Sequence, residues 1–225
     1  MVVVSLNKNL NQIIRRYCSV PIANIHVGIN THLYYKERIT RQRNKNTILF
    51  VSRFVSWKGI DTAMNVFKEL KKVKDDIKFI CIGDGPLKDL YFKEYKKMEG
   101  LTFITGLDCK GIIEYYKKAS LLLITSQYET FGITILEAMA AGLPIVASDL
   151  IVFHDRILND WTGYLVKNRD VDEFCNRIIR LIEDLGKRKE IINNAFAKVT
   201  EYDIDKISSE YITLYRKLQM QKVAS

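Results

Sequence analysis

Short apolar runs alternate along the chain with longer segments in which apolar residues recur every third or fourth position. The runs have the length and composition of buried strands, and the segments between them predict helices. Strand and helix alternation of this kind predicts an α/β fold with a doubly wound parallel sheet of about six strands. The strand runs lie at 47–52, 77–82, 101–105, 121–125, 144–147 and 163–166, and the main helical segments at 60–73, 86–98, 110–118, 132–142, 170–185, 188–198 and 203–219.

One ionisable residue interrupts the most apolar of these helices. Glu137 lies between Gly132 and Gly142, and it shares a helix face with Ile133 and Ala141. A carboxylate is costly to remove from water without partners, so we expect a polar group to meet it. For an ordinary helical glutamate that group is a neighbouring side chain or solvent at the rim, and the alternative is a ligand. The surrounding segments favour the ligand.

A polar loop with a second carboxylate leads into this helix. Residues 126–130 follow an apolar strand run and contain Glu129, and Gly132 opens the helix. In parallel α/β sheets, ligands bind where loops leave the carboxyl ends of strands. The amides around Phe131 and Gly132 would face an anion at the helix N-terminus. Two carboxylates and a helix N-terminus around one cleft fit a ligand that carries hydroxyls and phosphates.

Two cations follow the first strand of the repeating pattern. Arg53 and Lys58 lie in the loop that leaves the run at 47–52, and Gly59 permits a close turn into the next helix. Two cations at the carboxyl end of a strand can neutralise a diphosphate. The alternative for this segment alone is an ordinary solvated loop.

These segments together resemble a known signature. The Glu129-x7-Glu137 spacing, FG just after the first glutamate and the segment EAMAAGLPIVASD resemble the donor site of retaining GT-B glycosyltransferases, most closely family 4 (glycosyl transferases group 1). The resemblance runs from about Val2 to Leu218. It implies a Rossmann-like nucleotide-sugar-binding domain, the C-terminal half of a GT-B fold, at 47–200. It also implies a linker at 36–46, a C-terminal helix at 201–225, and at 1–35 only the tail of a mostly absent acceptor domain.

The resemblance also implies roles for individual residues. Arg53 and Lys58 would hold the donor pyrophosphate, Glu129 would contact the transferred sugar, and Glu137 would bind the ribose hydroxyls. Glu129, Arg53 and Lys58 are therefore the expected catalytic residues. Glu129 would act either as a nucleophile or beside a front-face attack guided by the leaving phosphate. Further substrate contacts are expected at Phe131, Gly132, Ile133, Gly83, Gly85, Thr105 and Gly106, although Gly83 and Gly85 also fit simple turn chemistry.

The chain departs from the family pattern in one loop. After Ser148-Asp149 the family typically has a glycine pair and then Pro-Glu. This chain has Ile151-Val152 and then His154-Asp155. Because side chains replace the glycine pair, we do not expect a ligand to approach the backbone closely in that loop. Asp155 keeps a carboxylate where the family has a glutamate.

The implied function is a retaining hexosyltransferase that moves a hexose from a nucleotide-diphosphate sugar to an acceptor. The sugar nucleotide, with UDP or GDP, is a substrate, and no cofactor is implied. The short chain leaves an alternative, a non-catalytic nucleotide-sugar-binding module or the donor half of a longer or two-chain enzyme. A basic nucleic-acid-binding domain is a third hypothesis from the net charge of +9, but no nucleic-acid motif accompanies that charge.

Composition bears on metal binding, on disulfide bonding and on the cellular location of the protein. The four cysteines and three histidines are scattered without metal-ligand spacing, so we expect no metal and buried free thiols in a reducing compartment. No apolar stretch approaches the length of about 18 residues that reads as a membrane span, and residues 1–20 lack a signal-peptide pattern. A cytoplasmic protein is expected. Its basic clusters are interpreted as solvated helix faces, or alternatively as surfaces that attract acidic membrane lipid, diphosphate substrates or nucleic acid.

An association with another chain is also expected. The apolar segment at Val2–Val4 would be a strand with open edges if its parent sheet is absent. We therefore expect it to pair, in a homodimer or with an acceptor-domain partner chain. The helix around 211–218 would expose part of its apolar face.

Overall fold

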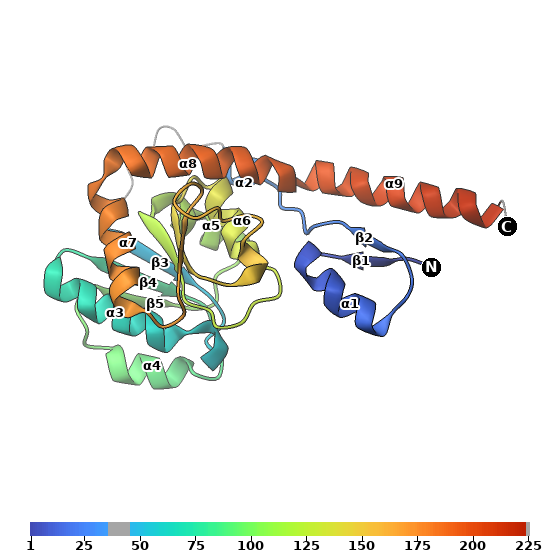
Figure 1. Ribbon diagram of the computed structural model, residues 1–225. Helices are drawn as coiled ribbons and strands as arrows, with labels where there is room; N and C mark the ends of the chain where they lie inside the picture. Colours follow the sequence, from blue (N-terminus) through green and yellow to red (C-terminus); the bar gives the residue numbers. More distant parts are fainter. Residues whose placement is uncertain (36–45, 224–225) are drawn as a thin grey trace.

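A six-stranded parallel sheet forms the centre of the protein, which we describe from a computed structural model covering residues 1–35 and 46–223 (Figure 1). The strand order is β5-β4-β3-β6-β7-β8, and every neighbouring pair is parallel. This confirms the predicted doubly wound α/β sheet. The strands are β3 (Thr47–Val51), β4 (Lys78–Ile82), β5 (Leu101–Ile104), β6 (Leu121–Ile124), β7 (Ile145–Ser148) and β8 (Tyr164–Val166).

The strand order reverses between β3 and β6. From β3 the chain builds outward through β4 to β5, and then it returns to the other side of β3 and builds outward through β6, β7 and β8. At such a switch point the two loops that leave neighbouring strands diverge to opposite faces, so a crevice opens at the carboxyl ends of the strands. The loops after β3 and β6 hold Arg53, Lys58 and Glu129, and the second of them leads into α6, which carries Glu137.

Helices cover both faces of the sheet and bury two apolar layers. Residues alternate between faces along β3, so Ile48 and Phe50 join one layer while Leu49 joins the other. The first layer lies under α3, α4 and α7, the second lies under α5 and α6, and α8 contributes to both. The helices are α3 (Ile60–Val73), α4 (Lys88–Tyr95), α5 (Cys109–Lys118), α6 (Ile133–Ala140), α7 (Val171–Glu183) and α8 (Leu185–Val199).

One predicted helix start is wrong. Pro86 was expected at the first position of a helix, but α4 begins at Lys88. The Leu87 amide donates to the Phe54 carbonyl at 3.1 Å, and the Lys88 amide donates to the Gly85 carbonyl at 3.0 Å. Because these bonds close a turn against the loop after β3, the helix starts only once the chain has left that contact.

A small N-terminal unit stands beside the sheet domain. It contains the parallel pair β1 (Val3–Ser5) and β2 (Ile22–Asn24), joined by α1 (Asn11–Tyr17). The predicted N-terminal strand therefore has a partner within the chain, with Val3 opposite Ile22. Pairing of its other edge with a second chain stays a prediction. Apart from Asn46, the predicted linker at 36–46 lies outside the described residues.

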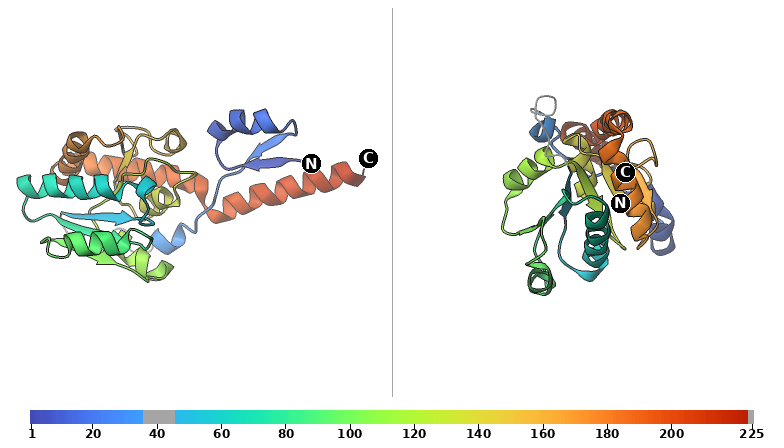
Figure 2. Two further views of the ribbon diagram at one scale, coloured as in Figure 1. Left: turned by 90° about the horizontal axis from the view of Figure 1, so that it is seen from below. Right: turned by 90° about the vertical axis from the view of Figure 1, so that its left-hand side faces the viewer.

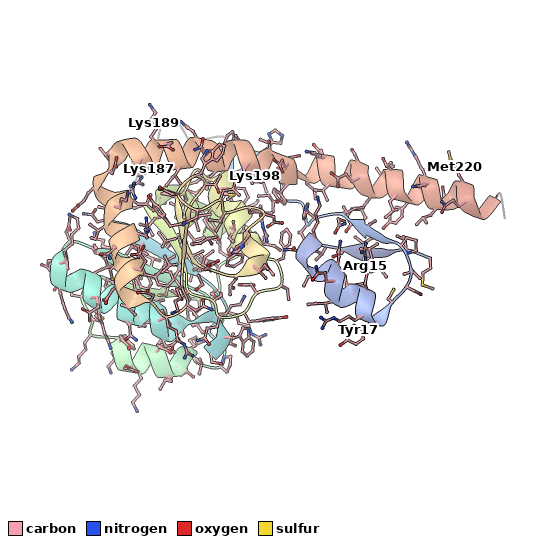
Figure 3. The ribbon with its side chains drawn as sticks, in the orientation of Figure 1. Arg15, Tyr17, Lys187, Lys189, Lys198 and Met220 are labelled. Atoms are coloured by element: carbon pink, nitrogen blue, oxygen red, sulfur yellow. The ribbon has the colours of Figure 1, made fainter. Side chains whose placement is uncertain are left out.

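The last helix, α9 (Ile204–Val223), extends away from the sheet domain past the N-terminal unit (Figure 2). Along it Tyr215 is 58% exposed, and Met220, near its free end in Figure 3, is 72% exposed. The expected exposure of apolar side chains on this helix is confirmed. In the described part of the chain, no helix is both long and apolar enough to cross a bilayer.

One expectation from composition needs correction. All four cysteines are free thiols, but only Cys81 is buried, and Cys109 is exposed at the first position of α5. The expectation of buried thiols is therefore wrong for Cys109. Among the basic clusters, Lys187 on α8 (Figure 3) forms ion pairs with Asp160 at 3.3 Å and Glu190 at 3.1 Å, so its charge is locally compensated.

Candidate functional site

Two adjoining cavities lie at the switch point of the sheet. One has a volume of about 490 Å³ and the other about 220 Å³. They share one wall, formed by the end of β3, the start of its loop and the first turn of α6. The shared residues are Val51, Ser52, Arg53 and Thr134. This is the crevice in which parallel α/β sheets bind their ligands.

The larger cavity extends toward the edge strand β5. Gly83 and Asp84 line it from the end of β4, Gly106 and Leu107 from the end of β5, and Ile112 from α5. Backbone packing is very close here, because a Cβ on Gly83 would lie 1.8 Å from the Ser52 carbonyl oxygen. With its apolar side chains and polar backbone edges, the larger cavity has a lining typical of small-molecule sites.

The smaller cavity contains an ion pair. The Lys58 Nζ donates to Glu129 Oε1, and the Ser126 hydroxyl donates to the same oxygen at 3.3 Å. The Lys58 side chain is 20% exposed and that of Glu129 is 12% exposed. The sequence places these residues 71 positions apart, and the adjacency of β3 and β6 brings them together. Lys58 therefore fixes the position of the carboxylate in the crevice.

Backbone contacts hold the two loops together. Gly59 has a left-handed φ of 68°, and a Cβ there would lie 1.9 Å from the Thr125 carbonyl oxygen. The Thr125 hydroxyl donates to the Gly59 carbonyl at 2.7 Å, and the Gln127 amide donates to the Trp57 carbonyl at 2.8 Å. Only glycine permits this approach. The loop that carries Lys58 is thereby held against the loop that carries Glu129.

Positive potential is available at the shared wall. Gly132 is the N-cap residue of α6, with a φ of 83°, and as a glycine it supplies no side-chain cap to the helix N-terminus. The first amides of a helix have no partner within it, and the helix dipole favours an anion at this end. Arg53 is exposed on the same wall, and none of the ion pairs seen among residues 1–35 and 46–223 includes it. This wall can hold a phosphate group.

Glu137 lies one turn further along α6 than Thr134, and two tyrosines contact it. The Tyr34 hydroxyl donates to Glu137 Oε1 at 3.1 Å, and the Tyr116 hydroxyl donates to Glu137 Oε2 at 3.0 Å. Burial, followed by the charge of Glu137, raises the pKa of both tyrosines well above the ordinary value of 10.0. Both hydroxyls therefore stay protonated and act as donors to the carboxylate.

A sequence profile described as glycosyl transferases group 1 matches residues 35–198. The chain belongs to this family. A glycosyltransferase of uncharacterized specificity from Methanocaldococcus jannaschii is 29% identical over 236 residues, a match that covers 95% of this chain and 59% of the relative. The poly(ribitol-phosphate) alpha-N-acetylglucosaminyltransferase of Staphylococcus aureus is 29% identical over 171 residues, covering 73% of this chain and 34% of that protein. The chain thus spans about a third to three fifths of the length of these curated relatives.

Solved structures of glycosyltransferase-type proteins share the fold. Sucrose-phosphate synthase from Thermosynechococcus elongatus superimposes with a TM-score of 0.84 at 23% identity, over 98% of this chain and 59% of that one. The Anabaena protein HepE in complex with UDP-glucose gives a TM-score of 0.82 at 22% identity, over 96% and 64% of the two chains. At these identities the likeness shows the fold, which is the Rossmann-like half of a GT-B architecture.

The structure of this glycosyltransferase-family chain brings five of the expected site residues to the cavities. Arg53 lines both, Gly83 and Gly106 line the larger, and Lys58 and Glu129 line the smaller. The other expected contacts are not among the lining residues. They are Glu137, Phe131, Gly132, Ile133, Gly85 and Thr105. Of these, Gly132 and Ile133 still supply the amides at the start of α6.

The side chain of Phe131 packs in the protein interior. Its side chain is 4% exposed, and the Arg156 guanidinium lies 4.1 Å from the ring centroid. Arg156 is fully buried and pairs with Asp155 at 2.9 Å. Phe131 therefore anchors the loop to the protein interior.

Residues that the sequence analysis missed fall into two groups. Residues of the first group line the cavities next to predicted residues. They could have been found from the sequence, because each lies just after a strand or near the start of a helix. This group comprises Ser52, Asp84, Leu107, Ile112, Ser126 and Thr134. The second group is the pair Tyr34 and Tyr116, for which no local pattern gave a signal.

The loop that departs from the family pattern forms a short 3-10 turn, η3 (Ile151–Phe153). Val152 and Phe153 are buried there, so apolar packing takes the place of the glycine pair. His154 Nε2 lies 2.5 Å from Asp149 Oδ1, which closes the loop on itself. Within the described residues, no group of three His, Cys, Asp or Glu side chains is placed to hold a metal ion.

Proposed function

We propose that the crevice binds a nucleotide-diphosphate sugar and that the protein is a retaining hexosyltransferase of the family 4 type. The observation that carries the proposal is the shared wall of the two cavities, where Arg53 and the uncapped N-terminus of α6 meet between a larger cavity and a smaller, ion-paired one. A diphosphate at this wall would have one cavity for its nucleoside and the other for its sugar.

The dimensions and chemistry support this assignment. The larger cavity, at about 490 Å³, lies within the range of about 300–1,000 Å³ that is usual for small-molecule sites. Gly83 and Gly106 leave room for a base to approach the backbone at the ends of β4 and β5. We favour UDP, because HepE and other solved relatives were crystallised with UDP or UDP-glucose, and GDP is the second candidate.

The transfer step follows from charge. Cleavage of the bond from sugar to diphosphate places negative charge on the leaving phosphate and positive character on the anomeric carbon. Arg53 and the amides of α6 would stabilise the leaving phosphate, with Lys58 near it. The Glu129 carboxylate, oriented by Lys58 and Ser126, would face the sugar. Because its charge is already paired, it is better suited to stabilising the developing positive charge than to attacking as a nucleophile.

The second candidate function is a nucleotide-sugar-binding module or the donor half of an enzyme completed by other residues. The observation that favours it is coverage, because this chain spans only 59% of the length of the Methanocaldococcus relative. In that case the acceptor site would come from another domain or a partner chain, or from a second copy of this chain. Contact with a membrane surface stays a further proposal, based on the basic clusters.

Calorimetric titration with UDP, GDP and their hexose conjugates tests the proposal. We expect one sugar nucleotide to bind and Arg53→Met to weaken it about tenfold or more, since a charge-assisted hydrogen bond contributes about 1.5–3 kcal/mol. The matched control is Arg15→Met, which removes the same charge from the exposed face of α1, outside the cavities (Figure 3). No binding by the unmodified chain, or equal effects of the two substitutions, would contradict the donor site.

A second measurement separates the enzyme from the module. The chain is incubated with the sugar nucleotide that binds, and NMR follows both donor consumption and the anomeric configuration of the released or transferred sugar. Release with the donor's own anomeric configuration supports a retaining transferase. Binding without consumption supports the module, and inversion would contradict retention.

A further inference from the structure

The Glu137 carboxylate is held by tyrosines from two different parts of the chain. Tyr116 belongs to α5, whereas Tyr34 belongs to α2 (His32–Tyr35), which precedes the sheet domain and packs against α5 and α6. The two rings contact each other edge to face, with centroids 6.3 Å apart. Tyr34 is 7% exposed and Tyr116 is fully buried. Both hydroxyls are thus aimed at the carboxylate by packed rings.

This cluster adjoins the larger cavity. Thr134 of α6 and Ile112 of α5 line that cavity. Glu137 is three residues after Thr134, and Tyr116 is four residues after Ile112, so each lies on the same helix face one turn, about 5.4 Å, further on. Glu137 and Tyr116 therefore each lie about one helical turn from a residue that lines the larger cavity.

The hydrogen bonding leaves Glu137 able to accept more. An ionised carboxylate offers about four lone-pair positions on its two oxygens. Among the described residues each tyrosine occupies one position, on a different oxygen, and these are the two hydrogen bonds that the carboxylate accepts there, while Glu137 itself is only partly buried. Acceptor positions thus remain on both oxygens, which suits a pair of adjacent hydroxyls. A vicinal diol matches this arrangement better than a single hydroxyl does.

We propose that Tyr34 and Tyr116 are positioning residues that aim Glu137 at the 2′ and 3′ hydroxyls of the donor ribose, so that the site selects ribonucleotides over 2′-deoxyribonucleotides. The inference rests on the proposed nucleotide-sugar site. It adds to that site the residues that distinguish ribose from 2′-deoxyribose in the nucleotide. Tyr34 lies just outside residues 35–198, the part that matches the family. Recognition of the donor therefore depends on a segment outside the donor domain.

Calorimetry with UDP and 2′-deoxy-UDP tests the proposal, with GDP and 2′-deoxy-GDP used instead if the unmodified chain binds GDP. We expect the unmodified chain to prefer the ribonucleotide about tenfold or more, because the deoxy form leaves the carboxylate short of a donor. Tyr34→Phe and Tyr116→Phe keep the rings and remove the hydroxyls. Each should reduce the preference about fivefold, mainly by weakening the ribonucleotide, with little change for the deoxynucleotide.

The matched control is Tyr91→Phe, which removes the hydroxyl of a mostly buried tyrosine on the opposite face of the sheet. It should leave the preference unchanged. The proposal is overturned if both Phe variants keep the full preference, or if they weaken the two nucleotides by the same factor, as a purely structural role would. Absence of binding by the unmodified chain to either ribonucleotide would instead refute the donor site itself.

Discussion

Gly59 and Gly106 form a natural pair for testing whether the close contact between the two loops holds the site together. Their φ angles are nearly equal, 68° and 71°, so alanine suffers the same left-handed backbone penalty at both positions. Their surroundings differ. A Cβ at Gly59 would lie 1.9 Å from the Thr125 carbonyl oxygen and 2.8 Å from its carbon, whereas a Cβ at Gly106 meets no atom within 4 Å.

The expected destabilisation follows from these distances. Left-handed alanine costs about 1–2 kcal/mol, and this is the whole expected effect of Gly106→Ala. At Gly59 the backbone of Thr125 must also move by more than 1 Å to restore an ordinary contact of about 3.4 Å, and overpacking of this kind adds about 1–3 kcal/mol or more. Gly59→Ala should therefore lower the free energy of unfolding by about 2–5 kcal/mol in total.

Urea denaturation measures the free energy of unfolding of both variants. The two values are compared only if both variants show the same dependence on urea concentration, so that the difference reports stability alone. For a chain of this size, melting temperatures should fall by about 2–4 °C per kcal/mol. A Gly59→Ala variant that is no less stable than Gly106→Ala would refute the reasoning, because it would show that the loops after β3 and β6 separate at little cost. Thr125 would then not be the element that holds Lys58 against Glu129.

Two further predictions concern charge. Glu129→Gln should reduce sugar transfer about a hundredfold by removing the charge that faces the anomeric carbon, while UDP affinity measured by calorimetry should not fall; a parallel loss of both would place Glu129 in nucleotide binding instead. The free energy of unfolding should fall as pH rises above 10, because the unfolded state releases tyrosine protons near the ordinary pKa of 10.0 while Tyr34 and Tyr116, whose pKa values are raised, keep theirs. Each of these two tyrosines lowers the free energy of unfolding by up to about 1.4 kcal/mol per pH unit above pH 10, and its full stabilisation is present below pH 10. Urea denaturation from pH 8 to 11 should show a shallower decline for Tyr116→Phe, and an unchanged slope would contradict the assignment.

Much of the fold could be predicted because its signals are local. Ile60–Val73 was predicted and observed as a helix with the same ends, since Gly59 precedes it and its apolar face repeats at helical spacing. The start of α4 was missed because it depends on a contact with Phe54, more than thirty residues earlier in the chain, that no local pattern encodes. Helix starts near proline and glycine are thus decided by whichever loop the turn packs against.

The polar crevice could be predicted only in outline. Arg53 and Glu129 each lie in a loop that follows a strand, and the sequence correctly predicted them at the same edge of the sheet. The reason is that the carboxyl ends of parallel strands all lie at one edge. The direct pairing of Glu129 with Lys58 requires in addition that β3 and β6 be neighbours. Sequence order alone does not give that adjacency, since β4 and β5 intervene along the chain.

Glu137 shows most clearly where local reasoning stops. Its apolar surroundings in the helix required a polar partner, and that requirement is met. The partners are hydroxyls from 103 and 21 residues earlier in the chain, on helices that only the folded sheet brings together. A tyrosine in an amphipathic helix carries no sign of what its hydroxyl will meet, because its ring satisfies the apolar pattern by itself. The same property lets Tyr34 and Tyr116 pack as core residues and still present donors to the carboxylate, so the site's sharpest polar contacts come from residues that the hydrophobic pattern assigns to the core.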